Sequence, residues 1–238
     1  MLEQFSNKKN LLYIVGSIIL VGIIAAIGVL AYVSKDLPDP NRLSEREIWQ
    51  STKIYDRTGE HLLYEAYQNQ KRTLVGLDQM MPLLPKAVVS IEDKGFYQHS
   101  GVQVRSILRA AFNNLIGKRS GSGGASTITQ QLIKNTMVGD ERSIFRKLKE
   151  AILALQLEKK YNKDEILKMY LNEVPFGSTN YGVEAASQSY FHKPAKDINL
   201  SEAATLAALI QAPTRYMNNP NTLHDRRDTI LKLMADQG

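Results

Sequence analysis

The apolar positions of the chain form one long uninterrupted run near the N-terminus and several amphipathic segments after it. The long run, Leu11 to Val33, has 23 residues without a charge or a proline. As a helix it would span about 35 Å, which is enough to cross a bilayer. Its length exceeds the roughly 7–15 apolar residues of a cleavable signal peptide. We therefore expect residues 11–33 to be a transmembrane anchor that is not cleaved.

The charges on the two sides of this anchor predict its orientation. Lys8 and Lys9 precede it, whereas Lys35 and Asp36 follow it and cancel. Cytoplasmic flanks carry the excess of Lys and Arg, so residues 1–10 are expected in the cytoplasm. The prediction is a single-pass protein of the cell membrane whose main domain is extracellular.

A linker and a β-hairpin are expected after the anchor. Residues 34–50 form the linker, because most of this stretch is polar and it contains two prolines. The runs Thr52–Asp56 and Glu60–Ala66 are rich in residues that favour strands. The short turn between them contains Gly59, which can supply a positive φ.

The rest of the chain has helical periodicity, which predicts a mostly α domain with a small β-hairpin. The apolar positions that recur at i+3 and i+4 are Val104, Ile107, Leu108, Ala111, Phe112 and Leu115; Phe145, Leu148, Ile152 and Leu155; and Ile166, Leu167, Tyr170 and Leu171. The stretch Lys118–Gly124, KRSGSGG, is rich in glycine and serine and predicts a flexible loop.

Composition narrows the chemistry. The chain has no cysteine, which excludes disulfides, thiolate metal sites and a cysteine nucleophile. Its formal net charge of +6 favours anionic partners such as lipid headgroups, pyrophosphate or nucleic acid. Because the domain is expected outside the cell membrane and lacks nucleic-acid recognition motifs, we predict no nucleic-acid partner.

The first chemical candidate is a carboxylate at the end of an apolar segment. The stretch Ala87–Gly101, AVVSIEDKGFYQHSG, places Glu92 and Asp93 where an apolar helix would end. A carboxylate in apolar surroundings has a raised pKa and is a candidate base. The alternative is a solvated helix end, which is the usual environment of such a pair.

The second candidate is the helix start in GASTITQQLIKN. Ser126 or Thr127 can cap this helix, and Thr127 with Gln130 has the spacing of a capping box. Free N–H groups at a helix N-terminus attract phosphate, and Lys134 lies about two turns further along. An ordinary capped helix explains the same pattern.

The third candidate is a basic ladder in ERSIFRKLKEAILALQLE. Arg142, Arg146, Lys149 and Glu150 follow one edge of a predicted helix whose opposite edge is apolar. This edge fits either a salt-bridged surface or a pyrophosphate site with an acid beside it.

Five stretches taken in order resemble the five motifs of glycosyltransferase family 51. They are EDKGFYQHSG, GASTITQQLIKN, RKLKEAILALQLE, YNKDEILKMYLNEVPFG and YGVEAASQSYFHKPA. This family is the glycosyltransferase module of class A penicillin-binding proteins and monofunctional transglycosylases, and the resemblance runs from about Thr52 to Pro213. It implies a lysozyme-like helical fold with a smaller, partly membrane-embedded subdomain. The implied glycosyltransferase domain is 51–220, with 221–238 as the start of a C-terminal connector.

The resemblance also implies the reaction and the roles of individual residues. Lipid II would be polymerised into β-1,4-linked glycan with inversion and release of undecaprenyl pyrophosphate, and Glu92 would be the general base. Glu150 would support it by orienting the donor, the basic residues or a divalent ion. Substrate contacts are implied for Ser126, Thr127, Gln130, Gln131, Lys134, Arg142, Arg146, Lys147 and Lys149. Residues implied to shape the site are Asp93, Phe96, His99 and Gly101, with His99 as a hydrogen-bonding structural residue.

The implied partners are lipid II, the growing glycan strand, the cytoplasmic membrane and a cell-wall synthesis complex. No metal ligand set is assigned, and Mg²⁺ or Mn²⁺ enters only as one of the roles open to Glu150. Three positions depart from the family pattern: Gly95, Ala125 and His192. A transpeptidase would need a Ser-x-x-Lys motif, and the sequence has it only at Ser6–Lys9, so penicillin binding is not predicted. We expect the chain to be a fragment of a bifunctional protein.

Two other functions fit parts of the pattern. A lytic glycosidase of lysozyme-like fold would also use a helix-end glutamate, but it would not need the cations near Lys134 and along the basic ladder. A membrane-anchored scaffold would explain the anchor and the amphipathic helices, but not the convergence of Glu92, Glu150 and the basic residues.

Overall fold

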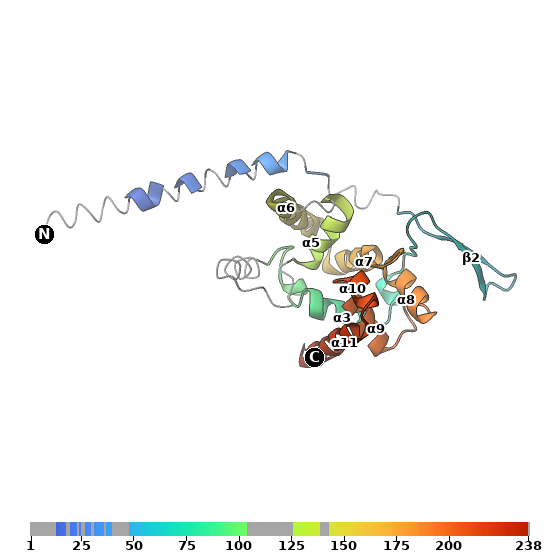
Figure 1. Ribbon diagram of the computed structural model, residues 1–238. Coiled ribbons are helices and arrows are strands. Elements are labelled where there is room, and N and C mark those ends of the chain that lie inside the picture. Colours follow the sequence, from blue (N-terminus) through green and yellow to red (C-terminus); the bar gives the residue numbers. More distant parts are fainter. Residues whose placement is uncertain are drawn as a thin grey trace, which may run out of the picture.

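The computed structural model describes residues 13–17, 20–22, 24, 27–29, 31–35, 37–39, 48–103, 126–138 and 143–237. The predicted hairpin is present: β1 (Thr52–Tyr55) pairs antiparallel with β2 (Leu62–Ala66), with Ile54 opposite Tyr64. Gly59 in its turn has a φ of +77°, which confirms the expected positive φ. The hairpin projects to one side of the helical body (Figure 1).

The body is mostly helical, as predicted. Its elements in chain order are η1 (Leu77–Gln79), α3 (Leu83–Glu92), η2 (Phe96–Gln98), α5 (Ile128–Ile133), η3 (Lys134–Val138), α6 (Ile144–Lys160), α7 (Lys163–Glu173), β3 (Pro175–Gly177), β4 (Asn180–Tyr181), α8 (Val183–Phe191), α9 (Leu200–Leu209), α10 (Pro213–Met217) and α11 (Pro220–Gln237). The short β3–β4 pair was not predicted. The amphipathic helix predicted from Val104 to Leu115 and the glycine-rich loop Lys118–Gly124 lie outside the described residues.

The core forms where α3, α9 and α11 pack together (Figure 1). Helix α9 is rich in alanine, and Ala203, Ala204 and Ala207 are fully buried. Side chains this small let neighbouring helices approach closely. Leu84 of α3 and Ile230 of α11 are also fully buried, and each such side chain contributes about 1.5–3 kcal/mol. This packing fixes the C-terminal end of α3, where the sequence places its candidate base.

Helix α7 follows the predicted pattern. Asn162 and Glu165 form a capping box at its start, in which each side chain accepts a hydrogen bond from the other residue's backbone N–H. The apolar stripe that predicted this helix, from Ile166 to Leu171, is buried in the core. Here periodicity identified both the helix and its buried face.

Helix α6 is present where periodicity predicted it, but its apolar stripe is not the buried face. Phe145 is 52% exposed and Leu155 is also exposed, whereas Glu150, Leu153 and Leu157 are fully buried. An amphipathic helix normally turns its apolar edge inward. Here the buried face joins Glu150 to Leu153 and Leu157, so the apolar edge that carries Phe145 and Leu155 remains on the surface.

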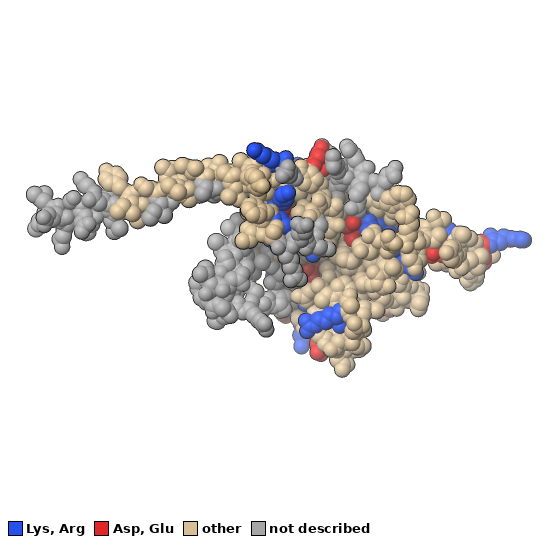
Figure 2. All heavy atoms as spheres, turned by 45° about the horizontal axis from the view of Figure 1, so that its top comes forward, with Lys and Arg blue, Asp and Glu red and all other residues tan. Residues whose placement is uncertain are grey.

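One helix among the described residues is long and apolar enough to cross a membrane. It spans Tyr13–Ser34, and its apolar 18-residue window has a mean hydropathy of 2.8 and no buried residue. Figure 2 shows its described part as a surface without charged side chains. The ring of Tyr32 near its end meets the ring of Phe145 edge to face, with centroids 6.3 Å apart. The exposed apolar edge of α6 therefore lies beside the end of this apolar helix.

Candidate active site

Glu92 is the last residue of α3, and its carboxylate is nearly enclosed, with 10% of the side chain exposed. The amide Nε2 of Gln131 donates a hydrogen bond of 2.9 Å to Glu92 Oε2. An arginine from α11, Arg226, lies 3.5 Å from Oε1. Burial raises the pKa of Glu92, the contacts with Gln131 and Arg226 offset part of this rise, and the charge of Asp93 adds to it. A buried carboxylate with a raised pKa matches the predicted base.

Gln131 is held in place by Tyr170 of α7. The Tyr170 hydroxyl donates a hydrogen bond of 2.8 Å to Gln131 Oε1, which directs the amide NH₂ toward Glu92. Tyr170 is fully buried, and burial raises its pKa well above the usual value, with the charges of Glu92 and Asp93 adding to the effect. The hydroxyl therefore remains a donor. Gln131 was expected to contact substrate, but in this structure it contacts the candidate base.

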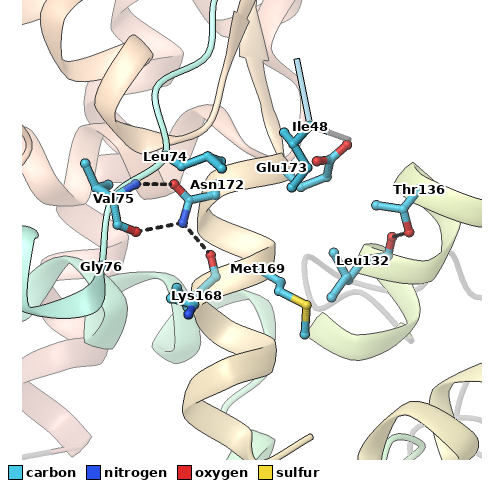
Figure 3. Close-up of a pocket in the computed structure, with 10 residues that line it drawn as sticks. All are labelled: Ile48, Leu74, Val75, Gly76, Leu132, Thr136, Lys168, Met169, Asn172 and Glu173. Atoms are coloured by element: carbon cyan, nitrogen blue, oxygen red, sulfur yellow. Dashed lines mark hydrogen bonds between the residues drawn. The ribbon is translucent and has the colours of Figure 1, made fainter. Parts of the chain in front are cut away.

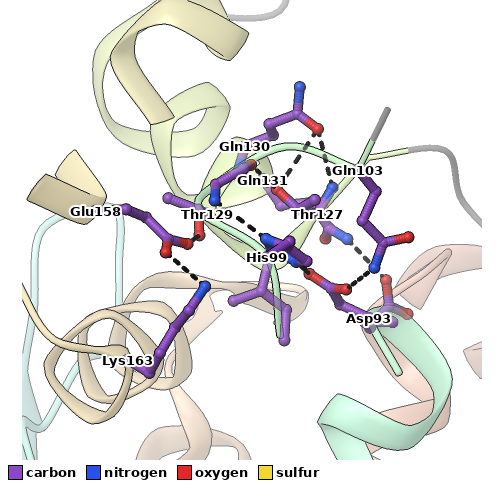
Figure 4. Close-up of polar contacts among 12 residues, drawn as sticks. Asp93, His99, Gln103, Thr127, Thr129, Gln130, Gln131, Glu158 and Lys163 are labelled. Atoms are coloured by element: carbon purple, nitrogen blue, oxygen red, sulfur yellow. Dashed lines mark hydrogen bonds and ion pairs between the residues drawn. The ribbon is translucent and has the colours of Figure 1, made fainter. Parts of the chain in front are cut away.

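Asp93 ties the loop after α3 to the start of α5 (Figure 4). Its Oδ1 accepts 2.7 Å from Gln103 Nε2, and its Oδ2 accepts 3.1 Å from the backbone N–H of Ile128. His99 Nε2 lies 2.9 Å from the same Oδ2, while His99 Nδ1 accepts from Gly101 N–H. Since Nδ1 accepts, Nε2 carries the proton that is donated to Asp93. These contacts agree with the structural role expected for His99.

The start of α5 has the predicted cap, and protein groups accept hydrogen bonds from two of its backbone N–H groups. Thr127 Oγ1 accepts 3.2 Å from Gln130 N–H, and Gln130 Oε1 accepts 3.0 Å from Thr127 N–H, which completes the capping box. The Asp93 carboxylate accepts a hydrogen bond from the backbone N–H of Ile128. These contacts are those of an ordinary capped helix, and a phosphate at this helix start stays a prediction.

A second cluster gathers around Glu150 on α6. Glu150 is fully buried, and its Oε2 accepts 2.6 Å from Lys147 Nζ. Its Oε1 lies 3.3 Å from Arg146 Nε, an ion pair that is not aligned as a hydrogen bond. Lys147 also donates 2.6 Å to Ser126 Oγ and keeps 47% of its side chain exposed. Glu150 thus fixes two cations beside the segment that begins α5.

The remaining predicted residues are distributed as follows. Lys134 lies where α5 continues into the π-helix η3, and Lys149 is half-buried on α6 without a salt bridge among the described residues. Arg142 lies outside the described residues. Phe96 is fully buried, and Lys163 Nζ lies 4.5 Å above its ring. Gly101 has a φ of +94°, and a Cβ there would lie 2.7 Å from the carbonyl oxygen of Ala154.

Several polar residues at this site were not found from the sequence. Glu158 of α6 accepts 2.5 Å from Thr129 Oγ1 and pairs at 2.5 Å with Lys163 Nζ, which joins α6, α5 and α7 (Figure 4). Arg226 and Tyr170 were not predicted as site residues either. A tyrosine in an apolar stripe and an arginine on a charged helix carry no local signal that distinguishes them.

Two departures from the family pattern can be followed in the structure, whereas Ala125 lies outside the described residues. A Cβ at Gly95 would lie 2.7 Å from Gln103 Nε2, the atom that binds Asp93, so a larger residue here would disturb that bond. His192 caps α8 with φ +56° and ψ +34°. This is the left-handed conformation that glycine favours.

A separate cavity of about 300 Å³ lies between α7 and the end of α5 (Figure 3). Asn172 closes one side, since its side chain accepts 2.9 Å from Val75 N–H and donates to the carbonyls of Val75 and Lys168. Neither Glu92 nor the α6 cations line this cavity. For metal binding, residues 48–103, 126–138 and 143–237 contain no group of three His, Asp or Glu side chains able to hold an ion.

Comparison with known proteins points to one family. The Transglycosylase family matches residues 59–235. The chain is 37% identical over 239 residues to penicillin-binding protein 1F of Bacillus subtilis (strain 168), covering 99% of this chain and 33% of that protein. It is 40% identical over 226 residues to penicillin-binding protein 1A of Aquifex aeolicus (strain VF5), covering 92% and 31%. A crystal structure of penicillin-binding protein 1A from Haemophilus influenzae has a TM-score of 0.42 and 24% identity, covering 80% of this chain and 19% of the other.

The chain therefore belongs to the transglycosylase family, glycosyltransferase family 51, whose domain occurs in class A penicillin-binding proteins. It spans about a third of the length of the curated relatives it matches.

Proposed function

We propose that this chain is a peptidoglycan glycosyltransferase that polymerises lipid II into β-1,4-linked glycan, with inversion and release of undecaprenyl pyrophosphate. The observation that carries the proposal is the pairing of an enclosed carboxylate, Glu92, with the Arg146–Lys147–Glu150 cluster. Helix α5 connects them, since Gln131 contacts Glu92 and the preceding Ser126 contacts Lys147. One part supplies a base and the other supplies positive charge.

Glu92 would accept the proton of the acceptor sugar's 4-hydroxyl as its oxygen attacks the donor's anomeric carbon. A raised pKa makes a carboxylate a stronger base near neutral pH, which is the property this step needs. The bond to pyrophosphate breaks as the glycosidic bond forms on the opposite face, so the anomeric configuration inverts. The amide of Gln131 would hold the carboxylate in the orientation for this transfer.

The leaving group carries several negative charges, and cations held beside it stabilise its departure. Lys147 and Arg146 are candidates because Glu150 holds both, while the ammonium of Lys147 remains accessible to solvent. Among the roles open to Glu150, the structure favours orientation of these basic residues. On the basis of the family resemblance, we propose that three further cations add to this positive charge: Lys134, Arg142 and Lys149. No cofactor is part of this proposal.

The apolar helix within Tyr13–Ser34 is proposed to be an anchor that keeps the catalytic domain against the outer face of the cytoplasmic membrane. The exposed apolar edge of α6 lies near its end and would face the same lipid surface. This placement suits a substrate carried on an undecaprenyl chain, which must stay in the bilayer while its sugars react. A cell-wall synthesis complex is the expected partner.

The test is to incubate the detergent-solubilised chain with labelled lipid II, with and without a divalent cation chelator, and to resolve the products by gel. Polymerisation gives a ladder of glycan products that lengthens with time. A parallel incubation with preformed glycan tests the lytic alternative, which would shorten that polymer and leave lipid II intact. A folded chain that changes neither substrate would favour the scaffold function.

A further inference from the structure

The two carboxylate oxygens of Glu92 are contacted by two different elements. Oε2 accepts from Gln131 of α5, and Oε1 faces Arg226 of α11 at 3.5 Å. Arg226 lies outside every stretch that carried the family resemblance, and the proposed reaction has not yet given it a role. Its side chain is as enclosed as that of Glu92, with 10% exposed in each case.

Other contacts fix Arg226 before it meets Glu92. Its Nε donates 3.3 Å to the backbone carbonyl of Ala208 in α9. Its guanidinium lies 5.8 Å from the ring centroid of Tyr216 in α10. With α9 and α10 holding the planar group, its NH2 atom is directed toward Glu92 at a reduced cost in side-chain entropy. The cation is therefore preorganised by contacts that do not involve Glu92 itself.

We infer that Arg226 is a positioning residue for the base. It would fix the rotation of the Glu92 carboxylate and favour its ionised form, and this inference rests on the proposed function. The terminal torsion of a glutamate is broad when nothing holds it, so one hydrogen bond to Oε2 leaves the group free to pivot. A second contact on Oε1 removes that freedom. Glu92 also lies at the C-terminal end of α3, where the helix dipole disfavours a negative charge and a cation compensates.

The groups around Glu92 come from three other helices and from the residue that follows α3, and they act in opposite directions on its protonation. Arg226 of α11 and Gln131 of α5 favour the ionised carboxylate. Asp93, which follows α3, and the low-dielectric surroundings to which buried Tyr170 of α7 contributes favour the protonated one. Without Arg226 the balance moves toward protonation, and the base would be ionised only at higher pH.

The kinetic test compares Arg226→Gln, Arg226→Lys and the control Arg227→Gln in the full chain polymerising lipid II. Arg227 is the adjacent residue, but it pairs with Asp228 on the surface at 2.8 Å and does not contact Glu92. Arg226→Gln should lower kcat at neutral pH by about tenfold with little change in KM, because orientation of the base is lost while substrate contacts remain. The acidic limb of the pH profile of kcat should move to higher pH in Arg226→Gln. Arg226→Lys should recover part of the lost kcat and part of the pH shift. Arg227→Gln should match the wild type.

A second measurement makes the inference independent of polymerase activity. The ¹³C resonance of the Glu92 carboxyl, assigned by its absence in Glu92→Gln, is titrated in the wild type and in Arg226→Gln. The titration midpoint should rise in Arg226→Gln and stay in place in Arg227→Gln. If the wild type does not polymerise lipid II, the proposed function fails, and this titration alone decides the role of Arg226. An unchanged midpoint, or a kcat loss explained entirely by a lower melting temperature and not recovered at higher pH, would overturn the inference.

Discussion

At the scale of single residues, the chemistry of Glu92 depends on neighbours that bring no charge of their own. Tyr170 donates to Gln131, and Gln131 donates to Glu92, so a buried hydroxyl sets the direction of the amide that faces the base. Chains of this kind strengthen each bond and fix a single orientation when every member has a partner.

Tyr170→Phe should therefore reduce polymerisation without changing the fold. Removing the hydroxyl leaves Gln131 Oε1 without its donor, which should cost about 1 kcal/mol of stability and lower kcat roughly threefold to tenfold. Tyr190→Phe is the matched control, since its hydroxyl donates 2.9 Å to the carbonyl of Phe176 and makes no contact with Glu92. Thermal melts and initial rates of both variants test the prediction, which fails if the two lose activity equally.

His192 stores backbone strain that glycine would remove. Its left-handed conformation costs a residue with a Cβ about 1–2 kcal/mol. Glycine avoids this cost, but part of the gain is lost because glycine loses more backbone entropy on folding. His192→Gly should then stabilise the chain by up to about 1 kcal/mol, a rise in melting temperature of roughly 2–4 °C. His192→Ala keeps the Cβ and should show no such rise; an equal gain in both variants would point to the loss of the imidazole instead.

Local signals explain which site residues were predictable. Glu92 ends an apolar segment, and Thr127 with Gln130 has the capping-box spacing, so both could be identified from neighbours in sequence. Arg226 contacts Glu92 from a helix that is far along the chain from α3. Asp93 accepts a hydrogen bond from the first residue of α5, which is also far from it in sequence. Contacts of this kind depend on packing between elements, which periodicity does not encode.

At the scale of elements, α6 shows how far periodicity can be trusted. The pattern predicted the helix correctly but not its buried face, because Glu150 is buried together with Leu153 and Leu157 while Phe145 and Leu155 are exposed. Apolar packing of Leu153 and Leu157 holds this face, together with Glu150 and its two cations and the contacts of Glu158 with Thr129 and Lys163.

The loop after α3 is fitted closely to the backbone of α6 at Gly101. A Cβ there would lie 2.7 Å from Ala154 O, and φ is already +94°, so Gly101→Ala must shift either the loop or the helix. We expect the free energy of unfolding of Gly101→Ala to fall by at least about 3 kcal/mol. Substrate binding should also weaken, because Asp93 and α6 move apart. Gly59→Ala also has a positive φ but meets no atom within 4 Å, so it should cost only about 1 kcal/mol. Denaturant unfolding of both variants measures the difference, and equal losses would show that α6 is not in close contact.

At the scale of the whole molecule, the hairpin, the helical body and the apolar N-terminal helix were all predictable, because each has a strong pattern of its own. Their arrangement was not, since it depends on contacts such as Tyr32 against Phe145. That contact places the exposed apolar edge of α6 close to the proposed anchor, and an apolar edge beside an anchor is expected to enter the lipid surface.

This placement can be tested with a spin label, because the chain has no cysteine and a single introduced one is unique. In proteoliposomes, a label at Phe145→Cys should be more accessible to oxygen than to a water-soluble nickel reagent. A label at Asp228→Cys, exposed on α11, should show the reverse. Water-like accessibility at both positions would mean that the apolar edge of α6 does not face lipid.

The central claim is that Glu92 is the base of a polymerising glycosyltransferase, and the most direct measurement is the rate of glycan formation from labelled lipid II by Glu92→Gln. The matched control is Glu165→Gln, an exposed substitution that keeps the capping box of α7. Our account predicts that Glu92→Gln folds like the wild type and polymerises roughly 10²–10⁴-fold more slowly, while Glu165→Gln forms normal ladders. Ladders of wild-type length and rate from Glu92→Gln would contradict the account.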